Sequence, residues 1–261
     1  MSRSEYLFGD NDIAAQRLEL LARVYRESTR AFLLETAGSA HFTLALDLGC
    51  GPGFTTHLLA ETLHCDLVIG VDVSPGFIEL ARANSNDRLS FIQHDVTVVP
   101  FPTGRANLIF ARFLLTHLRN PAAVVGNWAT QLEPSGLLLL EEAEAIRTTH
   151  SVLASYLNIV GTMLAAQSNQ LYAGRPLGTL KIPPGLKQVT NELRPLAVMN
   201  SNAARMFSLN MRAWKENDFI RANYSRHSIS ELERNLTELS QQESPSGETR
   251  WDMRQVAWSR E

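Results

Sequence analysis

The chain has 261 residues, of which 44% are hydrophobic and 20% charged, a composition typical of globular proteins that fold in water. Its formal net charge is -3, so no overall positive charge points to nucleic acid or an anionic membrane as a partner. The two cysteines suggest no disulfide framework, and no run of about 18 apolar residues suggests a membrane span or a signal peptide. We therefore expect a cytoplasmic protein that binds no nucleic acid, is not inserted in a membrane, and consists of one elaborated domain or two.

The first predicted element is an amphipathic helix, or a pair of helices, over residues 11–37. An apolar strand then follows over 42–48 and ends in a loop that contains Gly49, Gly51 and Gly53. Glycines in such a loop permit positive φ and let a ligand lie against the backbone. The spacing is G-x-G-x-G, with Phe54 where the dinucleotide fingerprint G-x-G-x-x-G has its third glycine, so a diphosphate cradle is disfavoured.

A second apolar run, 67–71, ends at Asp72, about twenty residues beyond the glycine loop. An acidic side chain at this place can accept hydrogen bonds from ribose hydroxyls. Ser74 and Pro75 predict the start of a helix, because serine caps a helix N-terminus and proline suits the first turn. The glycine loop and Asp72 together predict a nucleoside site.

The later elements continue the alternation of strands and helices. Strands are predicted over 89–96, 106–113, 137–140, 189–199 and 251–259, and helices over 55–63, 120–132, 151–167, 203–222 and 230–239, with a turn at 133–136. Such alternation favours an α/β fold with a doubly wound parallel sheet.

Residues 44–144 resemble the core of class I, Rossmann-like S-adenosylmethionine-dependent methyltransferases, through the glycine loop, Asp72 and the further acid Asp95 after the third strand. The sequence as a whole is most similar to the small-molecule branch of this family, which contains the ubiquinone, menaquinone and natural-product methyltransferases. The resemblance implies a doubly wound, seven-stranded, mostly parallel sheet with an antiparallel last strand and a helical cap over the active site. It divides the chain into an N-terminal helical cover (1–40), an S-adenosylmethionine-binding core (41–146), a cap insertion with return to the sheet (147–200), and C-terminal helices with the last strand (201–261).

S-adenosylmethionine is the cofactor that the resemblance implies. Asp72 would hold its ribose, Asp95 the adenine amino group, and Tyr6 and Arg17 its amino-acid moiety. The full set of cofactor-binding candidates is Tyr6, Arg17, Asp47, Gly49, Gly51, Gly53, Asp72, Val73, Asp95, Val96 and Arg112. Two structural alternatives stay open: Asp47 as a buried cap of the loop, and Arg17 as a solvated residue on a packing helix.

Three residues are candidates for the proton acceptor that a hydroxyl or phenol acceptor would need. They are His117 after the fourth strand, His150 in the cap and Glu142 at the end of the fifth strand. A packing or capping role is the alternative for each. An amine or a stabilised carbanion would need positioning alone.

Motifs of other acceptor classes are absent from the loop after the fourth strand. Residues 110–113 are not the N-P-P-Y motif of enzymes that methylate bases, and 112–119 hold neither the two glutamates that bind a guanidinium nor an acidic magnesium site. We therefore expect a small-molecule methyl acceptor, with oxygen slightly favoured over nitrogen or carbon, direct in-line displacement and no metal.

Aromatic and methionine side chains of the cap could line the acceptor pocket or form plain core; they are Tyr156, Met163, Tyr172, Met206, Phe207, Met211 and Trp214. Arg112, Arg175 or Arg205 could meet an acceptor carboxylate. Two other functions stay open. One is an NAD(P)-dependent Rossmann dehydrogenase, disfavoured by Phe54 and Asp95, and the other is a non-catalytic S-adenosylmethionine-binding regulatory protein. An oligomer is possible.

Overall fold

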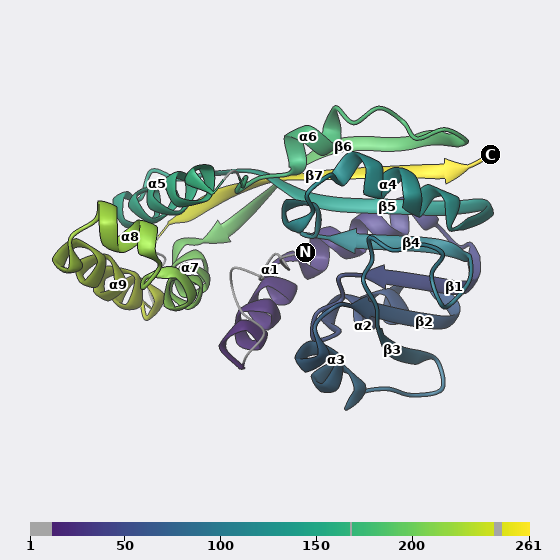
Figure 1. The fold of residues 1–261 in the computed structure, drawn as a ribbon, viewed down its shortest axis with the longest axis horizontal. Coiled ribbons are helices and arrows are strands. Elements are labelled where there is room, and N and C mark those ends of the chain that lie inside the picture. Colours follow the sequence, from purple (N-terminus) through teal and green to yellow (C-terminus); the bar gives the residue numbers. More distant parts are fainter. Residues whose placement is uncertain (1–11, 168, 243–246) are drawn as a thin grey trace.

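The computed structural model describes residues 12–167, 169–242 and 247–261, which are arranged around a seven-stranded sheet (Figure 1). The strands are β1 (His41–Leu48), β2 (His64–Asp72), β3 (Leu89–Gln93), β4 (Ala106–Arg112), β5 (Leu132–Arg147), β6 (Leu186–Met199) and β7 (Glu248–Arg260). Their order across the sheet is β3-β2-β1-β4-β5-β7-β6. The first five strands pair in parallel and β7 runs antiparallel to both β5 and β6. The predicted fold class is confirmed.

The helices are α1 (Asp12–Ala37), α2 (Phe54–Thr62), α3 (Pro75–Arg82), the short 3-10 helix η1 (Leu115–His117), α4 (Pro121–Thr130), α5 (Ser151–Ala166), α6 (Gly174–Gly178), α7 (Asn200–Trp214), α8 (Asp218–Asn223) and α9 (Arg226–Ser240). The predicted start of α3 is confirmed, since the Ser74 hydroxyl accepts a hydrogen bond from the Phe77 N–H and Pro75 opens the helix. The Asn120 side chain caps α4 in the same way.

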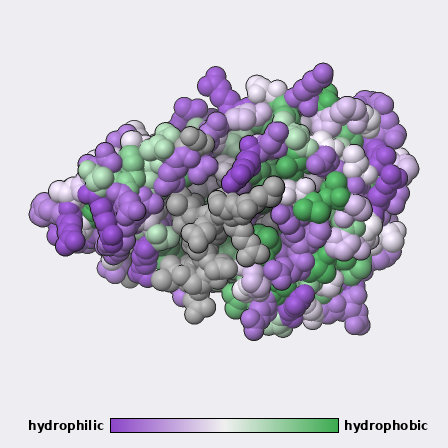
Figure 2. All heavy atoms as spheres, in the orientation of Figure 1, coloured by the Kyte–Doolittle hydropathy of each residue, from purple (hydrophilic) through white to green (hydrophobic). Residues whose placement is uncertain are grey.

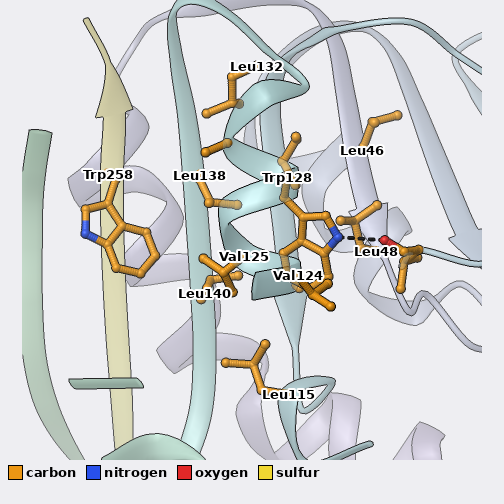
Figure 3. Packing of buried hydrophobic residues seen from close by; sticks show 14 of the residues in the cluster. Leu46, Leu48, Leu115, Val124, Val125, Trp128, Leu132, Leu138, Leu140 and Trp258 are labelled. Atoms are coloured by element: carbon orange, nitrogen blue, oxygen red, sulfur yellow. Dashed lines mark hydrogen bonds between the residues drawn. The ribbon is translucent and has the colours of Figure 1, made fainter. Parts of the chain in front are cut away.

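Both faces of the parallel part of the sheet are covered, because successive strand residues point to opposite faces. On one face Leu46 and Leu48 pack with Trp128 of α4 (Figure 3). On the other face Ala45 packs with Phe32 of α1 and with residues of α2 and α3. This explains why residues 44–48 of β1 are apolar except for Asp47, since neither set of positions faces water in this half of the strand.

A second core fills the cap, which lies at one end of the long strands β5, β6 and β7 (Figure 1). It joins α5, α7, α8 and α9 to Trp251 and Met253 of β7. The cap therefore takes helices from both the 147–200 and the 201–261 parts of the chain. Hydrophilic residues cover its outer end on the face drawn in Figure 2.

Several predicted boundaries are wrong. The turn at 133–136 lies inside β5, where Ser135 adopts φ 63 and the pairing with β4 shifts register. The helix predicted over 203–222 is two helices, because Asn217 caps a new helix that starts at Asp218 and accepts a hydrogen bond from the Phe219 N–H. The last helix starts at Arg226 with Ser225 as its cap, not at Ser230.

Among the described residues, no helix combines the length and apolar character that crossing a membrane requires.

Candidate functional site

The glycine loop between β1 and α2 has the backbone conformation that its sequence predicts. Gly49, Gly51 and Gly53 have φ of 70, 53 and 93, values that favour glycine. Space is restricted as well, since a Cβ at Gly53 would lie 2.8 Å from the Phe91 ring and one at Gly49 would lie 2.8 Å from Leu114. The loop is thus a bare stretch of backbone at the carboxyl edge of the sheet, where α/β proteins bind ligands.

Asp72 ties this loop to the end of β2. Its Oδ2 accepts a hydrogen bond of 2.8 Å from the Gly51 N–H, and its Oδ1 accepts one of 2.9 Å from the Ser74 N–H. These two bonds fix the orientation of the Asp72 carboxylate at the carboxyl edge of the sheet. Val73 beside it is 58% exposed. Asp72 and Val73 together offer an acceptor and an apolar surface next to the glycines.

Asp47 is buried below the loop and contacts the start of α2. Its Oδ2 accepts hydrogen bonds from the hydroxyls of Thr55 and Thr56, at 2.6 and 2.7 Å. Burial raises the pKa of Asp47 to about 6, although both hydroxyls favour the charged form. These contacts agree with the alternative in which Asp47 caps the loop from inside the protein.

Two consecutive residues after β3 lie in different environments, one exposed to solvent and one in the core. Asp95 is exposed, and its Oδ1 accepts hydrogen bonds from the N–H and the hydroxyl of Thr97. Val96 is 7% exposed and its carbonyl oxygen accepts the indole N–H of Trp128. Asp95 is therefore available to a ligand at the carboxyl edge, while Val96 is held by α4.

Arg112 belongs to a polar network beneath α1 that sequence reasoning missed. Its Nη1 donates to the Thr29 hydroxyl at 3.0 Å, and Thr29 donates to Glu141 at 2.6 Å. Gln255 donates to the other Glu141 oxygen at 2.7 Å. The Arg112 guanidinium also lies over the Tyr25 ring, 5.9 Å from its centre. One signal was present in the sequence: two glutamates in a row at a strand end must face opposite sides of the sheet.

Glu142, the second of these glutamates, holds the turn that carries His117. Its Oε1 accepts a hydrogen bond of 2.7 Å from the Leu115 N–H. The carboxyl is 2% exposed, and burial raises its pKa to about 8. Of the three proposed proton acceptors, the structure thus brings Glu142 and the His117 turn together.

His117 lies at the end of η1, where the residue is exposed to solvent on one side while neighbouring protein partly desolvates the imidazole. This desolvation, with the nearby charge of Arg17, lowers the pKa of His117 to about 4, so the imidazole is neutral at physiological pH. Arg17 is 6% exposed, so the alternative of a solvated arginine is wrong. His150 precedes α5 and Tyr6 lies outside the described residues.

The cap residues considered for an acceptor pocket are mostly core. Tyr156 stacks on Phe207 with ring centres 4.1 Å apart, and Trp214 lies 5.7 Å from Tyr156. Met163, Met206 and Met211 are at most 1% exposed. Only Tyr172 is partly exposed, with a pKa raised to about 12 by burial.

The residues of this site suit the binding and orientation of a ligand better than the formation of a covalent bond to a substrate. Bare glycine backbone, two carboxylates at strand ends and an exposed apolar side chain suit the sugar and base of a nucleoside. In the described part of the chain, no group of three or more His, Cys, Asp or Glu side chains could hold a metal ion. Both cysteines are buried, and burial raises the pKa of each thiol.

Sequence comparison matches the part of the chain that contains the glycine loop and Asp72 to a known family. Residues 46–140 match the family described as Methyltransferase domain. The chain is 33% identical over 165 residues to the trans-aconitate 2-methyltransferase of Methylobacterium radiotolerans, a match that covers 63% of this chain and 57% of the relative. It is 29% identical over 96 residues to the ubiquinone biosynthesis O-methyltransferase of Coxiella burnetii, covering 36% of this chain and 40% of the relative. The chain thus spans less than two thirds of the length of these relatives.

Solved structures share the fold at low sequence identity. The N-methyltransferase NodS of Bradyrhizobium japonicum, in complex with S-adenosylhomocysteine, has a TM-score of 0.51 at 15% identity, covering 99% of this chain and 93% of NodS. A phosphoethanolamine N-methyltransferase of Haemonchus contortus has a TM-score of 0.56 at 13% identity, covering 98% of this chain and 60% of that enzyme. At these identities the likeness concerns the fold alone.

Proposed function

Because residues 46–140 match the family described as Methyltransferase domain, we propose that the chain is a class I S-adenosylmethionine-dependent methyltransferase, which transfers a methyl group from S-adenosylmethionine to an oxygen atom of a small molecule. The observation that carries the proposal is the glycine loop, with three glycines at positive φ and the Gly51 N–H bound to Asp72. A Cβ in this loop would collide with Phe91 or Leu114, so the bare backbone is a requirement of the site.

The residues at the carboxyl edge fit the methyl donor. Asp72 places a carboxylate at the end of β2 for the ribose hydroxyls, exposed Val73 offers an apolar face for the base, and Asp95 is accessible for the adenine amino group. Gly49, Gly51 and Gly53 would let the donor approach the backbone. When bound, S-adenosylmethionine supplies an electrophilic methyl group on a sulfonium.

The chain's own contribution is to hold the acceptor oxygen in line and to keep water out. His117 is the proton acceptor in this proposal, since burial and Arg17 keep its ring neutral. A pKa of about 4 makes this imidazole a weak base, so it suits acceptors whose oxygen ionises readily. A carboxylate is already ionised at neutral pH and needs no base at all.

Glu142 acts through its hydrogen bond to the Leu115 N–H and so positions the His117 turn. Its raised pKa, about 8, keeps the buried carboxyl largely protonated at neutral pH, which avoids a second negative charge near the reacting oxygen. The relatives named above support oxygen over nitrogen through the ubiquinone biosynthesis O-methyltransferase.

The test is calorimetric titration with S-adenosylhomocysteine, with NADH as the control. We expect binding of the first and none of the second. The loaded protein would then be screened for methyl transfer to carboxylic acids, beginning with trans-aconitate, and to phenols, quinols and amines. Binding of NADH alone would favour a dehydrogenase, and donor binding with no transfer to any class would favour the regulatory alternative.

A further inference from the structure

A cavity of about 240 Å³ lies between α1 and α2, one turn of α1 beyond the contact of Leu18 with the glycine loop. Its lining consists of Glu19, Ala22, Arg23, Arg26, Phe54, His57, Leu58 and Arg112. Arg112 is also a candidate for cofactor or acceptor binding, and the other lining residues have no functional role assigned above. Its volume is below the range typical of drug-sized ligands, so an occupant must be small.

Positive charge dominates the lining. Three arginines and a histidine face the cavity against one carboxylate, that of Glu19. Arg26 is paired with Glu61 at the rim. Arg23 has no hydrogen bond or ion pair with any other residue of the described chain. At least one complete guanidinium fork is therefore open to a ligand, and this fork matches a carboxylate in geometry.

Arg112 adds a second cation at the inner end. Its guanidinium has five N–H donors, and among the described residues its hydrogen bond goes to Thr29. Two carboxyls, those of Glu141 and Asp47, interact electrostatically with Arg112. Burial raises the pKa of both carboxyls. Arg112 therefore adds a positive charge and guanidinium donors to the lining, with Glu141 and Asp47 as its charged neighbours in the protein.

We propose that the cavity between α1 and α2 binds a small organic acid with two or more carboxylates, held by Arg23, Arg26 and Arg112. The cations come from two elements, with Arg23 and Arg26 on α1 and Arg112 at the end of β4. A ligand with one charge would satisfy only one of them. Ala22, Phe54 and Leu58 supply an apolar wall for a carbon skeleton, which favours an organic acid over inorganic phosphate.

This inference does not rest on methyl transfer, because it concerns the binding of an anion at a site beside the glycine loop. The acid could be the methyl acceptor itself or a separate effector. An acceptor and an effector would be recognised by the same carboxylates. They differ in whether the bound acid becomes methylated.

The test is calorimetric titration with citrate at low ionic strength, with acetate as the monovalent comparison. We expect citrate to bind, Arg23→Gln to weaken it by about tenfold, the worth of one charge-assisted hydrogen bond, and acetate to bind far more weakly. Arg30→Gln is the matched control, since Arg30 is an exposed arginine of the same helix outside the lining. Rising salt should weaken citrate binding, because partly exposed charges are screened.

Three results would overturn the proposal: no citrate binding at millimolar concentration, equal losses in R23Q and R30Q, or displacement of citrate by S-adenosylhomocysteine. The last would mean that the cavity is only an end of the donor site. Separate titration with S-adenosylhomocysteine tells failure of this site from failure of the proposed function. Incubation of citrate or trans-aconitate with S-adenosylmethionine then distinguishes the sources: a methylated product identifies an acceptor, and an unmodified bound acid identifies an effector, and both support the site.

Discussion

The indole N–H of Trp128 in α4 donates a hydrogen bond of 2.8 Å to the carbonyl oxygen of Val96, directly after Asp95 (Figure 3). Both Trp128 and this carbonyl are buried, so the bond has no replacement from water. A helix on one face of the sheet thereby fixes the loop that carries a proposed adenine ligand.

Trp128→Phe should lower the free energy of unfolding by roughly 1–3 kcal/mol, because the Val96 carbonyl loses its buried donor. Trp258→Phe is the control, since Trp258 is equally buried but its indole N–H has no hydrogen-bond partner among the described residues. Urea denaturation of both variants measures the difference. A loss in W258F as large as that in W128F would assign the effect to packing instead of the hydrogen bond.

Gly53→Ala should destabilise the protein by more than Gly104→Ala. Both glycines have positive φ, which costs an L-residue roughly 1–2 kcal/mol. A Cβ at Gly104 has nothing within 4 Å, whereas one at Gly53 lies 2.8 Å from Phe91. Thermal unfolding compares the two, and G53A should in addition weaken binding of S-adenosylhomocysteine. Equal stability of the variants would mean that Phe91 moves aside freely.

Asp72→Ala should weaken binding of S-adenosylhomocysteine by roughly 1.5–3 kcal/mol, the worth of charge-assisted hydrogen bonds. Part of the loss would come from the Gly51 N–H, which Asp72 also holds. Asp66→Ala is the control, because Asp66 is an exposed carboxylate near the opposite end of the same strand. Calorimetry on both variants decides; equal affinities would overturn the ribose assignment.

Glu142→Gln should change how stability depends on pH. The folded protein keeps the Glu142 proton up to a pKa of about 8, whereas the ordinary value is 4.5. The bound proton therefore contributes its full stabilisation below pH 4.5, and this contribution is lost as the pH rises toward 8. The free energy of unfolding should fall by no more than about 1.4 kcal/mol per pH unit in this window. The advantage of E142Q over the parent protein should therefore grow across this window in urea denaturation. A difference between E142Q and the parent protein that stays constant across this window would contradict the burial effect.

His117→Gln should lower kcat by about 10²-fold, the lower end of the range for general-base catalysis, with little change in KM. His150→Gln, the other histidine considered, should have a small effect. Because the pKa of His117 is lowered to about 4, the parent enzyme should lose activity only as the pH falls toward that value. An acid limb near the ordinary value of 6.5 would exclude His117 as the group that titrates.

The nucleoside end of the site was predictable because its signals are local in sequence. Positive φ requires glycine at 49, 51 and 53, and Ser74 with Pro75 marks a helix start within a few residues. The network from Arg112 through Thr29 to Glu141 was not predictable, since Thr29 and Glu141 are 112 residues apart in sequence. The helix start at Ser225 was missed because Ser230 also suits a cap, and only packing of α9 on the cap core decides between them.

The boundary between core and cap lies inside strands. β5 and β7 pair from Leu137 with Ser259 to Arg147 with Arg250, with a register shift between Ala143 and Ala145. A cap joined through loops could be exchanged between relatives like a separate module. Here a transplanted cap would have to bring the ends of β5 and β7 with it, in matching twist and register, or its helices would arrive at the wrong angle to the glycine loop.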